Sequence, residues 1–230
     1  MNILFLVRLW PEFGGGETVT RTLANKFVSL GHNVSVAYFV DSQISDFAFV
    51  DDRITSFKIE DVECNQYYYD VSKSEIVEKQ ICDFILSNEI EIVINQWFPL
   101  EYTKSIITKT KAKVIKCYHT AFRNEVSTKE RFYSLFHKIN ENANLCKELV
   151  KVLISPLYER YLQRESISET EQYFPYVDKY VFLSSRFLEQ YIHVSKHYQY
   201  REKLYAIPNP LSINNLNSAD NFQRSNFAAI

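Results

Sequence analysis

The chain has 230 residues, of which 46% are hydrophobic and 23% charged, and 26 Lys and Arg stand against 28 Asp and Glu for a formal net charge of -2. This composition is typical of a globular protein and excludes a disordered, collagen-like or coiled-coil chain. The balanced charge gives no indication of a nucleic-acid partner, and we expect none. No stretch reaches the roughly 20 apolar residues of a membrane helix, and no cationic region precedes the first apolar run. We therefore expect neither a membrane span nor a signal peptide.

The cysteines show no pairing motif. None belongs to a Cys-x-x-Cys pair, and no Cys/His cluster has the spacing of a zinc site. We therefore expect reduced thiols, no metal site and a cytoplasmic location. The cysteines are Cys64, Cys82, Cys117 and Cys146.

The first 39 residues predict a strand, a glycine-containing loop, a helix and a second strand. The continuous apolar run 3–7 is typical of a central parallel strand that is buried on both faces. After three consecutive glycines, apolar residues recur at helical spacing up to Gly31, which is placed to cap the C-terminus of a helix. Residues 34–39 then alternate as a second strand. The residues at helical spacing are Val19, Leu23, Phe27 and Leu30.

The alternation of strands and helices continues to residue 210. Capping boxes at Ser72/Glu75 and Ser127/Glu130 predict two helix starts, and Ser155-Pro156 predicts a third. The pattern predicts an α/β fold with a Rossmann-like, doubly wound and mostly parallel sheet. Further strands are expected at 54–59, 90–94, 113–118, 180–183 and 204–207, and helices at 72–88, 100–110, 127–139, from 155 and at 185–193.

The composition changes after Pro210. Residues 212–225 are rich in Asn, Ser and Asp, as in a linker, and the apolar residues 227–230 are either the start of a further strand or a solvated coil. We assign residues 1–211 to one N-terminal domain. Residues 212–230 are assigned to an inter-domain linker and the start of a C-terminal domain that this sequence lacks.

Charge is unevenly distributed along the chain. Residues 103–164 contain 13 Lys and Arg against 5 Asp and Glu. Such a basic face suits an anionic lipid surface or a diphosphate-linked acceptor, but it is also typical of a solvated helix exterior. Peripheral contact with the inner face of a membrane is therefore one expectation.

Gly14, Gly15 and Gly16 are the main candidates for an anion site. Three glycines at a helix N-terminus let backbone N–H groups approach a phosphate, which the helix dipole favours. A tight turn that needs positive φ is the alternative. The spacing does not match the G-x-G-x-x-G fingerprint that directly follows a strand. A nicotinamide enzyme is therefore disfavoured, and no cofactor is expected.

Ligands of open parallel sheets bind beside the carboxyl ends of the strands. Four candidates occupy such ends, namely Arg8, Asn95, Trp97 and His119. An indole can stack on a sugar or simply pack, and an imidazole can exchange hydrogen bonds with a ligand or be paired with backbone. These residues mark the rim where we expect a ligand.

Three segments, in this order, resemble a retaining glycosyltransferase of family 4. Residues 2–39 contain Gly15-Gly16-Glu17 and Gly31-His32-Asn33-Val34-Ser35-Val36, which match that family's Gly-Gly-x-Glu-type turn and its Gly-His-x-Val-x-Val segment. Residues 180–191, YVFLSSRFLEQY, and 203–212, KLYAIPNPLS, are similar to its later "Leu-Ser" and "Ile-Pro-Asn-Pro" segments. The resemblance implies one half of a GT-B fold, in which two Rossmann-like domains enclose the active site.

The resemblance also implies roles for individual residues. Gly15 and Gly16 would face the donor diphosphate, with Gly14 giving the loop clearance. His119 would be the catalytic residue, in contact with the donor sugar at the reacting centre. The acceptor-binding candidates are the rim residues Arg8, Asn95 and Trp97 and, by resemblance, Thr120 and Arg123. The carboxylate and the cations that hold the donor would belong to the missing C-terminal domain, so we expect this chain to be inactive alone.

The leading prediction is the N-terminal, acceptor-binding domain of a retaining, metal-independent glycosyltransferase. The enzyme would move a sugar from a nucleotide-sugar donor to a glycan or lipid-linked acceptor, without a protein nucleophile. Two alternatives stay open. One is a non-catalytic Rossmann-like module that binds a sugar or a lipid, and the other is a nucleotide-sugar epimerase of the same architecture.

Overall fold

A computed structural model describes residues 1–11, 15–41, 49–60, 75–119, 153, 168, 170–195 and 198–209 of the chain. Its centre is a seven-stranded sheet in the order β5-β3-β1-β6-β7-β8-β9, and all neighbouring strands are parallel. The predicted α/β, Rossmann-like sheet is therefore confirmed. The strands are β1 (Asn2–Leu6), β3 (Asn33–Tyr38), β5 (Thr55–Lys58), β6 (Ile92–Asn95), β7 (Lys113–Tyr118), β8 (Lys179–Phe182) and β9 (Leu204–Ala206).

Strand β1 lies inside the sheet, between β3 and β6, as its unbroken apolar sequence predicts. Ile3 is paired with Val34 of β3 and with Ile92 of β6. Ile3 is 2% exposed, and Leu4, Phe5 and Leu6 have no exposed surface. Both faces of this strand are therefore covered, which explains why its sequence lacks the alternation of a half-buried strand.

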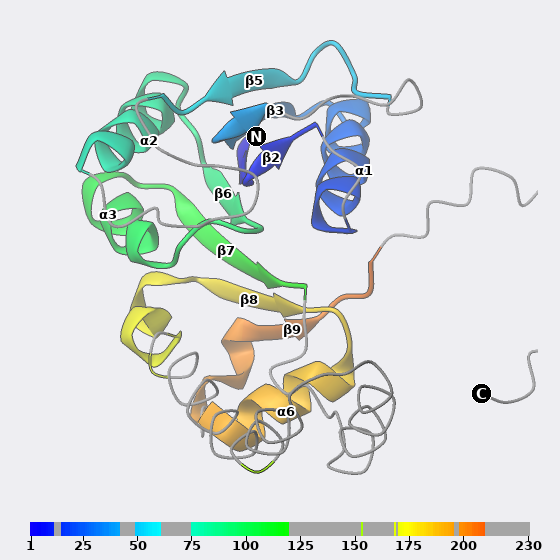
Figure 1. The fold of residues 1–230 in the computed structure, drawn as a ribbon, viewed down its shortest axis with the longest axis vertical. Coiled ribbons are helices and arrows are strands. Elements are labelled where there is room, and N and C mark those ends of the chain that lie inside the picture. The colour runs from blue at the N-terminus through cyan, green and yellow to red at the C-terminus, as the bar shows by residue number, and fades with distance from the viewer. Residues whose placement is uncertain are drawn as a thin grey trace, which may run out of the picture.

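Helices cover both faces of the sheet, with α1 on one side of the strands and α2 and α3 on the other (Figure 1). On the first face, Val28 of α1 and Phe5 of β1 belong to one apolar cluster. On the second, Ile81 of α2 and Tyr102 of α3 join Leu4. The described helices are α1 (Gly15–Ser29), α2 (Glu75–Ser87), α3 (Glu101–Lys109) and α6 (Ser185–Ser195).

Helix α1 ends at the glycine that the sequence predicts for its C-terminal cap. Gly31 has a φ of 85°, a conformation that favours glycine. Its N–H donates to the carbonyl of Val28 at 3.0 Å, and the N–H of His32 donates to the carbonyl of Phe27 at 3.0 Å. Leu30, the last of the residues predicted at helical spacing, directly follows the end of the helix, and its side chain is 58% exposed.

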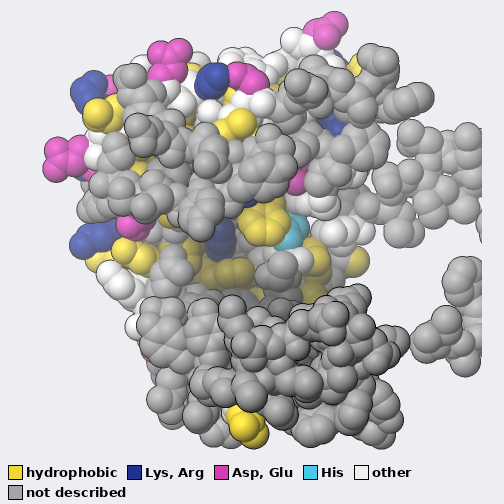
Figure 2. Space-filling model, in the orientation of Figure 1, with side chains coloured by type: hydrophobic (Ala, Val, Ile, Leu, Met, Phe, Trp, Pro, Cys, Tyr) yellow, Lys and Arg dark blue, Asp and Glu magenta, His cyan; other side chains and the backbone are white. Residues whose placement is uncertain are grey.

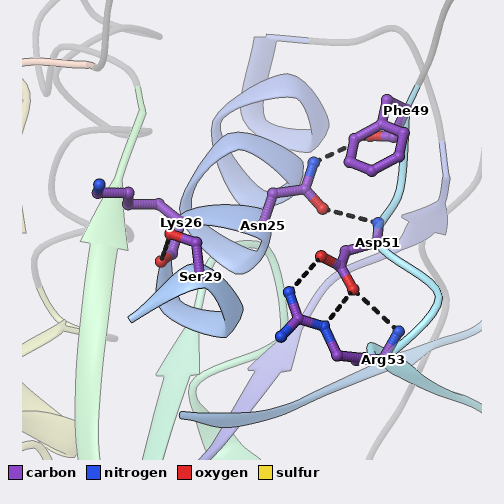
Figure 3. A network of polar contacts seen from close by, with 6 residues as sticks. All are labelled: Asn25, Lys26, Ser29, Phe49, Asp51 and Arg53. Atoms are coloured by element: carbon purple, nitrogen blue, oxygen red, sulfur yellow. Dashed lines mark hydrogen bonds and ion pairs between the residues drawn. The ribbon is translucent and has the colours of Figure 1, made fainter. Parts of the chain in front are cut away.

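A polar network attaches the segment before β5 to α1 (Figure 3). The Asn25 amide donates to the carbonyl of Phe49 at 2.9 Å and accepts from the N–H of Asp51 at 2.9 Å. Arg53 in turn donates to the Asp51 carboxylate from Nε at 2.9 Å and from Nη2 at 2.8 Å. The hydrogen bonds that the Asp51 carboxylate accepts from the Arg53 side chain, and then from the Arg53 backbone N–H, lower the pKa of Asp51 to about 2. The network fixes the edge of the sheet at its amino end, away from the strand ends that concern the site.

The sheet continues beyond β7 into an aromatic cluster. The rings of Tyr118 and Tyr180 are stacked, with their centroids 6.0 Å apart. The ring centroids of Phe182 and of Tyr191 in α6 are 5.0 Å apart. This packing fixes the last two strands, β8 and β9, to the rest of the sheet. Two short 3-10 helices flank it, at Phe174–Tyr176 and Tyr198–Lys203.

A second, two-stranded sheet pairs β2 (Leu9–Trp10) with β4 (Val40–Asp41), directly after β1 and β3. The sequence did not predict it, because two residues are too few to show a periodicity. The Trp10 indole N–H donates to the hydroxyl of Ser56 at 3.1 Å, which ties this small sheet to β5.

Some expectations concern residues outside the described ranges. These are Ser72 of the first capping box, the helices expected at 127–139 and from residue 155, and the linker at 212–230. The domain boundary at residue 211 therefore stays a prediction. Within the described part of the chain, no helix is both long and apolar enough to cross a membrane.

Candidate functional site

The strand order changes direction at β1. The chain first adds β3 and β5 on one side of β1, and then adds β6, β7, β8 and β9 on the other. Helix α1 leaves β1 toward one face, and α3 follows β6 on the opposite face. Open α/β sheets bind their ligands at such a switch point, beside the carboxyl ends of the two strands. The loops after β1 and β6 are therefore where this fold places a ligand.

Trp97 follows β6 and lies against the first turn of α1. Its N–H and that of Gln96 both donate to the carbonyl of Leu6 at the end of β1, at 3.4 and 3.0 Å. A Cβ on Gly16 would lie 2.8 Å from Cε2 and 3.0 Å from Cδ1 of the indole, and closer still to its Nε1. Only a glycine leaves room for the indole at this position. Gly15 differs, since a Cβ there would meet no described atom within 4 Å.

His119 follows β7 and is held by the two residues that follow β6. Its imidazole stacks on the Trp97 indole, with ring centroids 5.3 Å apart and an interplanar angle of 19°. Its Nε2 is hydrogen-bonded to the side-chain oxygen of Gln96. Because a carbonyl oxygen only accepts, the proton is assigned to Nε2 and the lone pair to Nδ1. Nδ1 is buried and has no hydrogen-bond partner among the described residues.

The His119 imidazole is neutral near pH 7. Burial, followed by the positive charge of Lys116, lowers the pKa of His119 to about 4. A neutral imidazole can orient a hydroxyl group by hydrogen bonding, but it brings no positive charge to the site. The chemistry available at His119 is therefore positioning and hydrogen bonding.

A buried polar side chain, Asn95, supports the loop after β6 through hydrogen bonds. Asn95 has no exposed surface, and its side-chain oxygen accepts from the N–H of Phe98 at 2.9 Å and from Nζ of Lys116 at 3.0 Å. Lys116 is 8% exposed and also donates to the carbonyl of Phe98 at 3.3 Å. Asn95 thus holds the loop that carries Trp97. Its side chain has no exposed surface with which to make the predicted contact with an acceptor.

The first turn of α1 offers one open position for an anion. Gly15 is exposed and Gly16 is buried. Glu17, also in the first turn, is 7% exposed, and its carboxylate offsets part of the helix dipole there. The Thr20 hydroxyl donates to the carbonyl of Gly16 at 2.9 Å. The phosphate contact at Gly15 stays a prediction, while Gly16 has a packing role that the sequence did not reveal.

The remaining predicted residues are placed only in part. Arg8 is half-buried, and its carbonyl accepts from the N–H groups of Phe39 and Val40, both at 3.1 Å. This carbonyl joins the loop after β1 to the loop after β3. Gly14, Thr120 and Arg123 lie outside the described residues. The structure therefore brings Gly16, Trp97 and His119 together and leaves the roles of the other candidates as predictions.

Two residues of this site, Gln96 and Lys116, are not among the candidates predicted from the sequence. Gln96 is 1% exposed and pairs with His119, and Lys116 is buried beside Asn95. The available signal was an Asn-Gln pair directly after a buried strand, and a lysine that follows the apolar pair Val114-Ile115 inside a predicted strand. A buried polar side chain normally has a partner, so each of these residues predicts a polar neighbour on the next strand.

Hydrophobic side chains and a histidine lie together in a hollow on one face of the molecule (Figure 2). Trp97 is 36% exposed, so part of the indole is open to a ligand.

Within the described ranges, no group of three or more His, Cys, Asp or Glu residues could hold a metal ion.

No protein-family model and no curated protein matches the chain. Among solved structures, a glycosyltransferase from Rickettsia africae ESF-5 matches with 16% identity and a TM-score of 0.49, over 90% of this chain and 42% of that chain. An alpha/beta-galactoside alpha-2,3-sialyltransferase from Photobacterium phosphoreum matches with 14% identity and a TM-score of 0.35, over 90% of this chain and 52% of that chain. The chain thus spans about half the length of these proteins or less.

Proposed function

We propose that this chain is the acceptor-binding, N-terminal domain of a retaining glycosyltransferase of family 4 with GT-B architecture. The whole protein would transfer a sugar from a nucleotide-sugar to a glycan or lipid-linked acceptor. A C-terminal domain would hold most of the donor, and no cofactor is required. We place the protein in the cytoplasm, with peripheral contact at the inner face of the membrane through the basic region 103–164.

The observation that supports this proposal is the placement of the His119 imidazole at the end of β7, beside the switch point of the sheet. The ring is held beside the partly exposed indole of Trp97, which itself rests on the first turn of α1. A sugar ring needs an aromatic surface and hydrogen-bonding groups, and a diphosphate is favoured at a helix N-terminus. In this proposal the aromatic ring, the imidazole and the exposed Gly15 at the start of α1 serve one ligand at the same strand-end region.

The proposed reaction uses no protein nucleophile. The bond between the anomeric carbon and the diphosphate oxygen breaks, and the nucleoside diphosphate leaves with the electron pair. The acceptor oxygen bonds to the anomeric carbon from the same face, and its proton passes to the leaving diphosphate. Stabilisation of the leaving charge is then the main catalytic contribution. The α1 N-terminus would contribute to it, and His119 would orient the donor sugar once the protein atoms that cover Nδ1 have moved.

Donor binding can be tested on the 230-residue chain by NMR. Titration of the ¹⁵N-labelled chain with UDP-glucose, UDP-N-acetylglucosamine or GDP-mannose should shift the signals of the Gly15 amide, the Trp97 indole N–H and the His119 ring at millimolar concentration. Inorganic pyrophosphate should shift Gly15 without shifting Trp97 or His119. If every nucleotide-sugar leaves all three signals unchanged, the proposed donor site is wrong.

Product analysis separates the proposal from its two alternatives. The whole protein, in the form that carries the proposed C-terminal domain, is incubated with a nucleotide-sugar, with and without glycan and lipid-linked acceptors. A new glycoside with retained configuration supports the proposal. An altered nucleotide-sugar without any acceptor overturns it in favour of an epimerase. Ligand binding without turnover overturns it in favour of a binding module.

A further inference from the structure

We propose that Trp97, seated on Gly16, and Gln96 are positioning residues that together fix the orientation and the tautomer of the His119 imidazole. The proposal rests on the proposed function only for the role that it gives to His119. It goes beyond the roles predicted from the sequence. There, Trp97 contacts the acceptor, Gly16 contacts the donor phosphate, and Gln96 has no role.

The seat of the indole is a packing contact across the switch point of the sheet. Gly16 belongs to the helix after β1, and Trp97 belongs to the loop after the neighbouring strand β6. The indole atoms Cε2 and Cδ1 lie 2.8 and 3.0 Å from the place where a Cβ of residue 16 would be. The backbone of Trp97 is tied to the carbonyl of Leu6 at 3.4 Å. The indole is therefore restrained from both its backbone and its ring.

The imidazole of His119 receives two restraints of different kinds. Stacking on the indole, at 5.3 Å between centroids and 19° between planes, sets the plane of the ring. The hydrogen bond from Nε2 to the Gln96 oxygen sets the direction of the ring within that plane. A plane and a direction together leave no free rotation, whereas either contact alone leaves one torsion undetermined. Both partners follow the same strand, β6, which is paired with β7.

Gln96 also decides which nitrogen of the ring carries the proton. Its side chain is 1% exposed, and its amide nitrogen has no hydrogen-bond partner among the described residues. With the oxygen toward His119, Nε2 is protonated and Nδ1 is the acceptor. If the amide were turned over, its nitrogen would donate to Nε2 and the proton would sit on Nδ1. The tautomer that a substrate hydroxyl meets is therefore set by Gln96.

The tautomer can be read directly from long-range ¹H–¹⁵N NMR spectra of the histidine ring in the 230-residue chain. In the unchanged chain we expect His119 as the neutral Nε2–H form at pH 7. Gln96→Leu, which removes the acceptor, should give a mixture of both tautomers. Gln96→Glu keeps an acceptor oxygen of nearly the same shape, so the Nε2–H form should be retained and its pKa should rise, because a carboxylate stabilises the protonated ring.

Variants of the indole and its seat test the stacking contact. Trp97→Phe should keep the His119 signals close to their original positions, and Trp97→Leu should shift and broaden them. Gly16→Ala should produce the same change as Trp97→Leu. Added to Trp97→Leu, Gly16→Ala should produce no further change, since the indole that it displaces is gone. Gly15→Ala is the matched control and should leave His119 unchanged.

Unaltered His119 signals in both Gln96→Leu and Trp97→Leu would overturn the proposal, and so would an unaltered tautomer in Gln96→Leu alone. If a leucine variant does not fold, the variants Gln96→Glu and Trp97→Phe still test the proposal. Loss of the Nε2–H form in the glutamate variant contradicts the role of Gln96, and a reordered His119 ring in the phenylalanine variant contradicts stacking. These readouts need no transferase activity. A chain that passes them but binds no nucleotide-sugar would refute the proposed function and leave this inference standing.

Discussion

The Cα of Gly16 and the indole of Trp97 are in contact across the point where the strand order reverses. A Cβ at residue 16 would lie 2.8 Å from Cε2 of the indole. Gly15 and Gly16 are therefore glycines for different physical reasons. Gly16 is small because an aromatic ring occupies the adjacent space, whereas Gly15 is exposed and open.

This difference predicts opposite effects of two neighbouring alanine substitutions on stability. Gly16→Ala forces the indole out of its seat and should lower the free energy of unfolding by about 1–3 kcal/mol, as overpacking generally does. Gly15→Ala introduces a better helix former where space is free and should change the free energy of unfolding by about +0.5 to +1 kcal/mol. Urea denaturation followed by circular dichroism measures both. Equal loss of stability in the two variants would show that the indole contact does not determine the need for glycine.

A second prediction concerns the buried oxygen of Asn95. It accepts hydrogen bonds from the N–H of Phe98 and from Nζ of Lys116. Asn95→Leu keeps most of the volume but removes this acceptor, and it should cost about 2–4 kcal/mol of folding free energy. Asn95→Asp keeps the oxygen and adds a favourable charge beside the ammonium, so its cost should be below about 1 kcal/mol.

Urea denaturation at pH 7 compares the two variants of Asn95, with the intact chain as reference. The contrast between them is the decisive result, because both change residue 95 and only one removes the acceptor. A leucine variant as stable as the aspartate variant would mean that the Asn95 oxygen contributes little to the loop that carries Trp97.

A third prediction concerns turnover in the form of the protein that is active. His119→Ala removes the hydrogen-bonding ring at the switch point and should lower kcat by about 100-fold, the scale of a lost positioning or hydrogen-bonding group. Circular dichroism should show that the variant remains folded, since His119 lies at the end of β7 rather than inside an apolar cluster. Turnover close to that of the unchanged enzyme would remove His119 from the site.

The fold could be predicted from the sequence because its signals are local. The apolar run of β1, the helical spacing that ends at Gly31 and the strand Lys113–Tyr118 each depend on residues close together in the chain. The two-residue strands β2 and β4 could not be predicted, because their pairing depends only on the neighbouring ends of β1 and β3.

The candidate site could be predicted only as a set of strand ends. The contact between Gly16 and Trp97 depends on β1 lying next to β6, and the bond between Gln96 and His119 depends on β6 lying next to β7. Neither adjacency is encoded in a local pattern. The burial of Asn95 likewise depends on which face α3 covers, so a polar residue expected at the rim became an internal support.

The last prediction is a dependence of stability on pH that originates at His119. The pKa of this residue falls from an ordinary 6.5 to about 4 in the folded chain, because burial and Lys116 disfavour the charged ring. Above pH 6.5 the ring is neutral in both states, and the stabilisation is fully present. As the pH falls from 6.5 to 4, the unfolded chain takes up a proton that the folded chain does not, so stability decreases. Below about pH 4 both states are protonated, and this contribution ends.

The loss is at most about 3 kcal/mol and should be smaller because the ring is partly exposed. Urea denaturation of the unchanged chain and of His119→Gln, at intervals between pH 7 and pH 4.5, isolates it. The glutamine variant should lack the decrease in this window. It should still lose stability at lower pH, where carboxylates such as Asp51, whose pKa is lowered to about 2, become protonated. Parallel pH profiles of the two proteins above pH 4.5 would contradict a buried, neutral imidazole at the switch point, and with it the state of His119 on which the proposed hydrogen bonding depends.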